Sequence, residues 1–124
     1  GGIQGRTEAT GRGVQYALRE FFRHPEDMKI AGLEGSLDNK RVVVQGLGNV
    51  GYHAAKFLQK EDHCLITGII ERDGALTHDD GINVEAVRAH IMATGGVKGF
   101  DGATYVENGT SVLENPVIFL SQRR

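Results

Sequence analysis

The chain has 124 residues, which is enough for one small domain and too few for a two-domain enzyme. Its 14 basic and 16 acidic side chains give a net charge of −2, so it lacks the basic stripe with which proteins bind a nucleic-acid backbone. A hydrophobic share of 40%, 18 glycines and only 2 prolines argue against a disordered or collagen-like chain and predict a globular fold with many tight turns.

The sequence also lacks the features of membrane proteins and of disulfide-bonded secreted proteins. No run approaches the roughly 18 consecutive apolar residues of a membrane span, and we find no signal peptide. The single cysteine, Cys64, cannot form an internal disulfide and is expected to be a small buried side chain in a cytoplasmic protein. Because the chain opens at Gly1 without a methionine, we expect it to be part of a longer protein.

The first predicted element is an amphipathic helix capped by Thr7 or Thr10. Its apolar face has the spacing of a helix packed on one side, and consists of Val14, Ala17, Leu18, Phe21 and Phe22. The helix is expected to end at His24, because the residue before a proline disfavours helical backbone angles. Residues 25–40 then predict a loop with room for one helical turn.

Strands and helices alternate over the rest of the chain. We expect strands over 41–45 and 65–70, helices from Val50 to about Lys60 and over 83–94, and the start of a third strand at 116–120. Residues 71–74 are expected to close the second strand, and 97–111 to be irregular. The strands are continuous apolar runs, which are typical of a parallel sheet buried on both faces.

A G-x-G-x-x-G motif at Gly46, Gly48 and Gly51 lies directly between the first predicted strand and the helix after it. In dinucleotide-binding proteins these glycines permit a tight turn, let the backbone approach a pyrophosphate and let the helix lie close to the strand. Glu71 follows 20 positions after Gly51, where such proteins have an acid that binds the adenosine ribose hydroxyls. The pattern predicts a dinucleotide site, with a glycine-rich turn that binds no ligand as the alternative.

The sequence also bears on which dinucleotide binds and on whether a metal site is present. A carboxylate at Glu71 repels the 2′-phosphate of NADP, but the adjacent Arg72 is able to pair with that phosphate, so NAD is favoured and NADP stays open. The five histidines lack the spacing and the cysteine partners of a metal site. Asp79-Asp80-Gly81 is typical of a turn rather than of a calcium loop, and no metal site is predicted.

Three segments, in this order, resemble the nucleotide-binding domain of glutamate dehydrogenases, within the wider glutamate, leucine, phenylalanine and valine dehydrogenase family. They are 5–13, 46–51 and 71–74, and the first is similar to the glutamate-type signature rather than to the leucine-type one. The resemblance extends from Gly1 to about Val117. It implies an α/β fold, namely part of a Rossmann-like NAD(P)-binding domain with a doubly wound parallel sheet.

The resemblance also implies roles for individual side chains. Thr10 and Asn49 match positions that hydrogen-bond the nicotinamide carboxamide, although the residues alone suggest a helix cap and a turn residue. The cofactor-binding positions implied in total are Thr10, Gly46, Gly48, Asn49, Val50, Gly51 and Glu71. The parent reaction is the oxidative deamination of L-glutamate to 2-oxoglutarate with NAD. The family's catalytic lysines and aspartate belong to a preceding substrate domain, so no catalytic residue is predicted here.

We accordingly expect one truncated NAD(P)-binding domain, with an N-terminal helix and linker over 1–40, half of the dinucleotide fold over 41–117, and a tail over 118–124 that departs from the family. A doubly wound fold has about six strands, and the sequence predicts fewer. We therefore expect the isolated chain to be inactive, to bind NAD weakly if at all, and to form a homo-oligomer or swapped dimer through the exposed edge of its first strand or through its first helix. A non-catalytic nucleotide-binding module and a non-functional remnant are the alternatives.

The tail suggests a genetic hypothesis. After Val117 the family resemblance implies Asp-Ile-Leu-Ile-Pro-Ala-Ala-Leu-Glu, whereas the chain ends with Ile118-Phe119-Leu120-Ser121-Gln122-Arg123-Arg124. Synonymous codons can be chosen for Val117 and the implied sequence after it such that deletion of the third base of the valine codon produces the observed ending, followed by a stop codon. We hypothesise that such a deletion truncated a full-length dehydrogenase, which sequencing of the DNA tests, and we expect the third strand to fray or end at Leu120.

Overall fold

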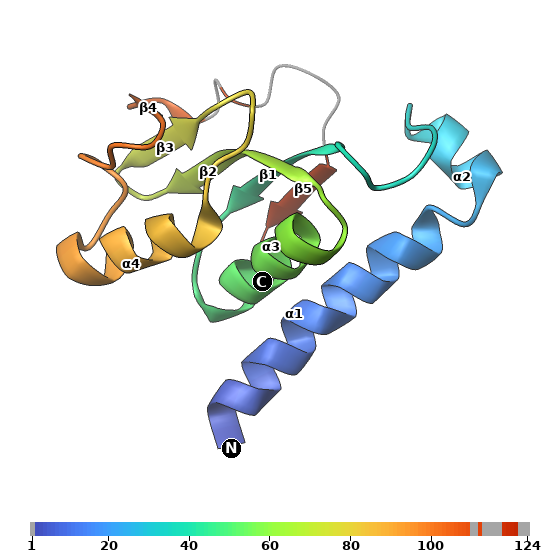
Figure 1. Cartoon of the computed structure of the whole chain (residues 1–124), viewed down its shortest axis with the longest axis horizontal. Helices are drawn as coiled ribbons and strands as arrows, with labels where there is room; N and C mark the ends of the chain where they lie inside the picture. The colour runs from blue at the N-terminus through green and yellow to red at the C-terminus, as the bar shows by residue number, and fades with distance from the viewer. Residues whose placement is uncertain (1, 110–111, 113–117, 122–124) are drawn as a thin grey trace.

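The computed structural model describes residues 2–109, 112 and 118–121 (Figure 1). Within them the chain folds as an α/β structure, a sheet with helices packed against it. The helices are α1 (Gly2–Phe21), α2 (Pro25–Ile30), α3 (Asn49–Glu61) and α4 (Val84–Thr94), and the strands are β1 (Arg41–Gln45), β2 (Leu65–Glu71), β3 (Gly74–Thr77), β4 (Thr104–Val106) and β5 (Ile118–Ser121).

The sheet has the strand order β4-β3-β2-β1-β5. β1 pairs in parallel with β2 on one side and with β5 on the other, whereas the pairs β2–β3 and β3–β4 are antiparallel. The α/β prediction is therefore confirmed, and the predicted parallel sheet is confirmed in part: β2, β1 and β5 are parallel, whereas β3 and β4 join the sheet antiparallel. β3 lies where no element was predicted and β4 lies within 97–111, which was predicted to be irregular. With 4 and 3 residues, both strands are too short for a clear periodicity.

A hairpin turn reverses the chain between β2 and β3. Gly74 opens β3 with a φ of 140°, and a Cβ atom there would lie 2.7 Å from the Tyr105 ring. Only glycine therefore lets β4 pack so closely on this turn. The next two residues, Ala75 and Leu76, have no exposed surface, so burial rather than sequence periodicity explains why this short strand joins the sheet.

The hydrophobic core lies between the sheet and the pair α3 and α4 (Figure 1). Val42 and Val44 of β1 belong to one buried cluster with Leu58 of α3 and Val87 of α4, and all four are fully buried. Val43 alternates to the other face of the sheet, where Gly68 leaves room for it and for Val112. β1 is thus buried on both faces, as its uninterrupted apolar run predicted.

The first helix begins earlier than predicted. Because α1 runs from Gly2 to Phe21, Thr7 and Thr10 lie inside it, and the prediction that either one caps the helix is wrong. The helix packs along α3 of its own chain. Gly11 lies at the closest approach, because a Cβ atom there would come within 2.7 Å of the His53 Cβ.

A polar cluster fixes α1 against the end of α3. Arg12 Nη1 lies 2.5 Å from Glu61 Oε1, and Arg19 Nε lies 2.8 Å from Asp62 Oδ1. Between these two ion pairs, the fully buried Gln15 donates from Nε2 to both carboxylates, at 3.1 Å and 2.8 Å. Since a buried amide needs its partners, the cluster restricts the orientation of α1 on α3 more than an apolar contact would.

The last described strand corrects two expectations. β5 pairs with β1 from Val42 opposite Ile118 to Gln45 opposite Ser121, so the prediction that β1 has an exposed edge is wrong. The strand also includes Ser121, one residue past the predicted end. The remaining tail, 122–124, and the predicted strand start at 116–117 lie outside the described residues. Among the helices of the described part, none is long and apolar enough to cross a membrane.

Candidate functional site

The glycine motif forms the turn between β1 and α3. Gly46 has a φ of 88°, a left-handed conformation that favours glycine, and its N–H donates to the Ile70 carbonyl at 2.9 Å. Gly48 is the N-cap residue of α3 and has no side chain to cover the helix N-terminus. Gly51 is buried in the first turn of the helix. The motif therefore connects a strand to a helix N-terminus as the sequence predicted.

Glu71, the predicted ribose-binding acid, lies at the end of β2 and reaches this turn. Its Oε2 accepts a hydrogen bond from the Leu47 backbone N–H at 2.9 Å. The two residues are 24 positions apart and meet because β1 and β2 are parallel neighbours whose carboxyl ends lie at the same edge of the sheet. The structure thus brings the acid and the glycine turn together.

A cleft of about 330 Å³ opens beside Glu71, and we term it the polar cleft because charged residues of the 71–73 segment are part of its lining. It lies at the carboxyl ends of β1 and β2 and is lined by Gln45, Gly46, Ile70, Glu71, Arg72, Asp73 and Gly95. Arg72 therefore lies beside Glu71 at the same cleft, so both side chains weighed in the choice between NAD and NADP are present there.

A second, more apolar cavity of about 220 Å³ lies on the other side of the β1 carboxyl end. It is bordered by α1, β1, α3 and β5, and its lining consists of Val14, Val44, Gln45, Val50, Gly51, Ala54, Phe119, Leu120 and Ser121. Gln45, the last residue of β1, lines both cavities. The glycine turn is therefore flanked by a polar cleft and an apolar cavity.

The two residues implied to bind a carboxamide have other partners in the structure. Thr10 is exposed, and its hydroxyl donates to the Arg6 carbonyl at 2.9 Å within α1. It lies one helical turn before Val14, which lines the apolar cavity. Asn49 begins α3, and its Oδ1 accepts from Arg88 Nη2 at 2.6 Å.

Arg88 is a site residue that the sequence analysis missed. From α4 it donates to the Leu47 carbonyl at 2.7 Å as well as to Asn49. No local signal marks it, because it belongs to an amphipathic helix that begins long after the glycine motif. Only the packing of α4 beside α3 brings its guanidinium to the turn.

Asp73 was also missed, and it forms one wall of the polar cleft. Its carboxylate accepts from the backbone N–H groups of Lys98 and Val97, at 3.0 Å and 3.1 Å. The Lys98 N–H bond above all, and then the Val97 N–H bond, holds the pKa of this carboxyl below its usual range, against a partial desolvation that raises it. Gly96 permits the approach, because a Cβ atom there would collide with the carboxylate.

The other polar residues weighed from the sequence have structural positions. Cys64 is buried, as predicted; burial raises the pKa of its thiol to about 12, and its Sγ lies 3.4 Å from the Leu37 carbonyl. His53 is buried on the α3 face that meets α1, and this burial lowers its pKa. Gly81 completes the predicted turn with a φ of 99°. Among the described residues, no three His, Cys, Asp or Glu side chains are grouped as metal ligands.

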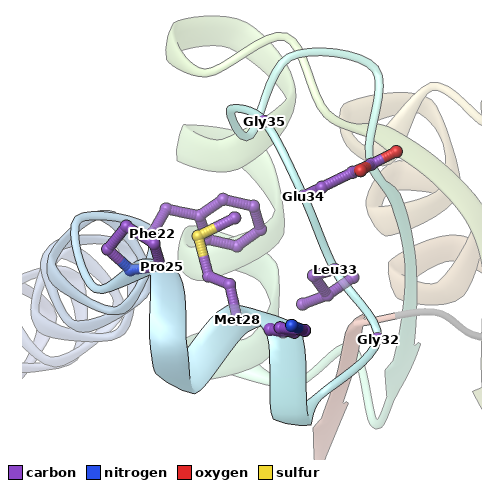
Figure 2. A pocket seen from close by; sticks show the side chains of 8 residues that line it. Phe22, Pro25, Met28, Gly32, Leu33, Glu34 and Gly35 are labelled. Carbon is purple, nitrogen blue, oxygen red and sulfur yellow. The ribbon is translucent and has the colours of Figure 1, made fainter.

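A larger hollow, of about 570 Å³, lies away from the glycine turn (Figure 2). It is formed where α1 gives way to α2 and the segment that leads to the amino end of β1. Figure 2 shows the Phe22 ring and the Met28 side chain side by side at this hollow, with Leu33 and Glu34 on the facing segment. None of its lining residues belongs to the glycine motif.

The chain is similar to members of one enzyme family. The sequence profile of the glutamate/leucine/phenylalanine/valine dehydrogenases matches residues 1–120, past the expected limit of the resemblance at Val117. A probable glutamate dehydrogenase of Sinorhizobium fredii is 44% identical over 118 residues, which are 94% of this chain and 26% of that protein. An NADP-specific glutamate dehydrogenase A1 of Halobacterium salinarum is 36% identical over 120 residues, which are 97% of this chain and 27% of that protein.

The structural similarity agrees with the sequence similarity. The chain spans about a quarter of the length of these relatives. The hetero-hexameric glutamate dehydrogenase of Thermus thermophilus, crystallised with leucine, aligns with a TM-score of 0.61 at 29% identity, over 78% of this chain and 21% of that chain. Because the family profile matches nearly all of the sequence, the chain belongs to the glutamate/leucine/phenylalanine/valine dehydrogenase family.

Proposed function

We propose that the chain is the cofactor-binding part of a glutamate dehydrogenase that oxidises L-glutamate to 2-oxoglutarate with NAD. The observation that carries this proposal is the hydrogen bond from the Leu47 N–H to Glu71 Oε2. It joins a G-x-G-x-x-G turn to an acid at the end of the next parallel strand, which is the arrangement that dinucleotide-binding folds use for a pyrophosphate and a ribose. The similarity to glutamate dehydrogenases supports the choice of substrate.

The strand order supports a Rossmann-like half-domain. β1 lies between two parallel neighbours, β2 and β5, which follow it at different distances in the sequence. In open α/β sheets, ligands bind outside the carboxyl ends of strands where the strand order reverses. The polar cleft and the apolar cavity both lie at that end of β1, and they suit the two halves of a dinucleotide.

The residues present fit a nicotinamide dinucleotide. Backbone groups of Gly46, Gly48 and Val50 at the α3 N-terminus would hold the pyrophosphate, and Glu71 would accept from the adenosine ribose hydroxyls. Thr10 and Asn49 would face the carboxamide, as the family resemblance implies. When bound, the nicotinamide supplies the hydride acceptor of the reaction. The chain's own residues would bind and orient this group, and the family resemblance implies that the catalytic side chains belong to a substrate domain.

The proposed preference for NAD depends on Glu71. The Glu71 carboxylate, which is hydrogen-bonded to the turn, would repel the 2′-phosphate of NADP. Arg72 lines the same cleft and would attract that phosphate. We propose that Glu71 prevails, because it is fixed by its hydrogen bond to the turn. Since one relative is NADP-specific, the two cofactors have to be compared directly.

Calorimetric titration of the chain with NAD and with NADP tests the proposal. We expect weak NAD binding, and Glu71→Ala should lower the affinity for NAD about tenfold, equivalent to about 1.4 kcal/mol, and that for NADP less. Glu34→Ala removes an equal charge at the distant hollow and should change neither affinity. Equal losses for the two dinucleotides in the Glu71 variant would contradict the role proposed for this acid.

The expectation that this chain carries no catalytic side chain gives a second test. We expect the purified chain to form no NADH from glutamate and NAD, because the groups that bind the amino acid and move its protons lie in the substrate domain. The assay needs a preparation free of host glutamate dehydrogenase. Steady NADH formation that follows the chain through purification would mean that catalytic residues are present in it after all.

A further inference from the structure

One guanidinium from outside the glycine motif contacts two groups of the turn. Arg88 Nη1 lies 2.7 Å from the Leu47 carbonyl oxygen, and Arg88 Nη2 lies 2.6 Å from Asn49 Oδ1. These acceptors precede Arg88 by 41 and 39 positions. Because a guanidinium is a rigid planar fork, two bonds to it define the positions of both acceptors relative to α4.

The backbone at Leu47 is held from both sides. Its N–H donates to Glu71, its carbonyl accepts from Arg88, and its side chain is fully buried. In a trans peptide the carbonyl and the following N–H point in opposite directions. The bond from Arg88 to the Leu47 carbonyl therefore directs the Gly48 N–H away from α4.

The second bond sets the polarity of the Asn49 side chain. An arginine has donors only, so the atom of Asn49 that faces Arg88 is the oxygen Oδ1. The amide nitrogen Nδ2 then lies on the side turned away from Arg88 and offers a hydrogen-bond donor. This donor is the group that a carbonyl oxygen of a carboxamide requires.

We propose that Arg88 is a positioning residue for the dinucleotide, which sets the pyrophosphate turn through the Leu47 carbonyl and the donor end of Asn49 through Oδ1. The inference rests on the proposed function and deepens it, because it makes affinity depend on a helix outside the glycine motif. The ligand class is a nucleotide with a pyrophosphate, and the nicotinamide carboxamide is the group that Asn49 meets.

Binding of ADP-ribose, NAD and adenosine to the full chain tests the proposal by ligand-observed NMR. Arg88→Met should lower the affinities for ADP-ribose and NAD about tenfold and leave that for adenosine, which has no pyrophosphate, unchanged. Arg88→Lys keeps the charge but not the fork, and should restore little of the loss. Unchanged ADP-ribose affinity in the methionine variant, or full recovery in the lysine variant, would overturn the proposal.

Lys56→Met is the matched control for charge. The Lys56 ammonium lies 5.2 Å from the centre of the Tyr52 ring and the Arg88 guanidinium 5.5 Å from it, so both variants remove a cation near the same ring. Because the described contacts of Lys56 are with aromatic rings and not with the turn, we expect its loss to leave ADP-ribose affinity within about twofold of the wild type. If both methionine variants lose ADP-ribose affinity equally, Arg88 acts only through its positive charge, and its positioning role is overturned.

A measurement on the ligand-free chain separates this inference from the proposed function. Amide hydrogen exchange at Leu47, Gly48 and Asn49 should be about tenfold faster in Arg88→Met than in the wild type, while amides of β2 exchange as before. If the wild-type chain binds no dinucleotide, the proposed function is wrong. The exchange rates of these three amides in the ligand-free chain still show whether Arg88 holds the turn. Unchanged exchange at all three amides would overturn the positioning role by itself.

Discussion

Gly11 of α1 and His53 of α3 lie at a crossing so close that a Cβ atom on Gly11 would be 2.7 Å from the His53 Cβ and 2.8 Å from the Ala54 backbone nitrogen. Real Cβ atoms do not approach other atoms so closely, and one of the two groups is backbone, which cannot rotate away. The absence of a side chain at Gly11 therefore lets α1 lie along α3.

Gly11→Ala should destabilise the chain. Alanine is favoured over glycine inside a helix by about 1 kcal/mol, but the overlap with α3 would force the helices apart, at a cost of about 1–3 kcal/mol. We expect a net loss in the free energy of unfolding, measured by urea denaturation. Gly13→Ala is the control: a Cβ atom there meets nothing within 4 Å, so the same substitution should stabilise. Equal effects of the two substitutions would mean that the crossing is looser than described.

Asp73→Asn should loosen the loop after α4 and change how stability depends on pH. Because the folded pKa of Asp73 lies below the ordinary value of 3.8, this carboxylate adds stability above that value, and the addition is lost as pH falls through the folded pKa. The wild type should therefore exceed the variant in stability at neutral pH, with the difference shrinking toward acid pH. Asp101→Asn makes the same substitution at an exposed position and serves as the control. A difference in stability between the wild type and Asp73→Asn that stays constant with pH would contradict the prediction.

Asn49→Ala should weaken binding of the nicotinamide end of the dinucleotide more than binding of the ADP-ribose part. We expect NAD to lose affinity about tenfold and ADP-ribose, which lacks nicotinamide, to lose less, because the amide of Asn49 is predicted to meet the carboxamide. Titration of both ligands gives the comparison. If ADP-ribose loses as much as NAD, Asn49 acts on the turn and not on the nicotinamide.

The outer edge of β5 should bring two copies of the chain together. Within the described residues β5 is the last strand of the sheet, and its Phe119 is 43% exposed. We expect a concentration-dependent dimer in sedimentation experiments, weakened about tenfold by Phe119→Lys. Met92→Lys changes another exposed apolar residue, on α4, and should have no such effect. A monomer at every concentration would rule out this edge as an interface.

Part of the site could be predicted from local sequence because it consists of neighbouring residues. A strand, a glycine turn and a helix follow one another from Arg41 to Glu61, and the left-handed conformation of Gly46 is one that glycine favours. The acid at Glu71 could be predicted because β2 is the next strand and its length places the residue at the same edge of the sheet. The resemblance to glutamate dehydrogenases was also available from the motifs and is confirmed.

The contacts that complete the site depend on distant segments and could not be read from local patterns. Arg88 and Asp73 reach their partners because of how α4 and the loop after it pack. No motif surrounds Arg88, and the 71–74 motif that includes Asp73 does not indicate that its carboxylate binds the backbone of residues 97 and 98. The two short antiparallel strands depend on burial: Ala75 and Leu76 of β3 are fully buried in the sheet, and β4 pairs with these residues. The sequence by itself determined the elements with strong local preferences, namely the glycine turn and the long apolar segments. Only the tertiary structure decided which side chains hold the turn, because hydrogen bonds and burial between segments far apart in the chain form only once those segments pack.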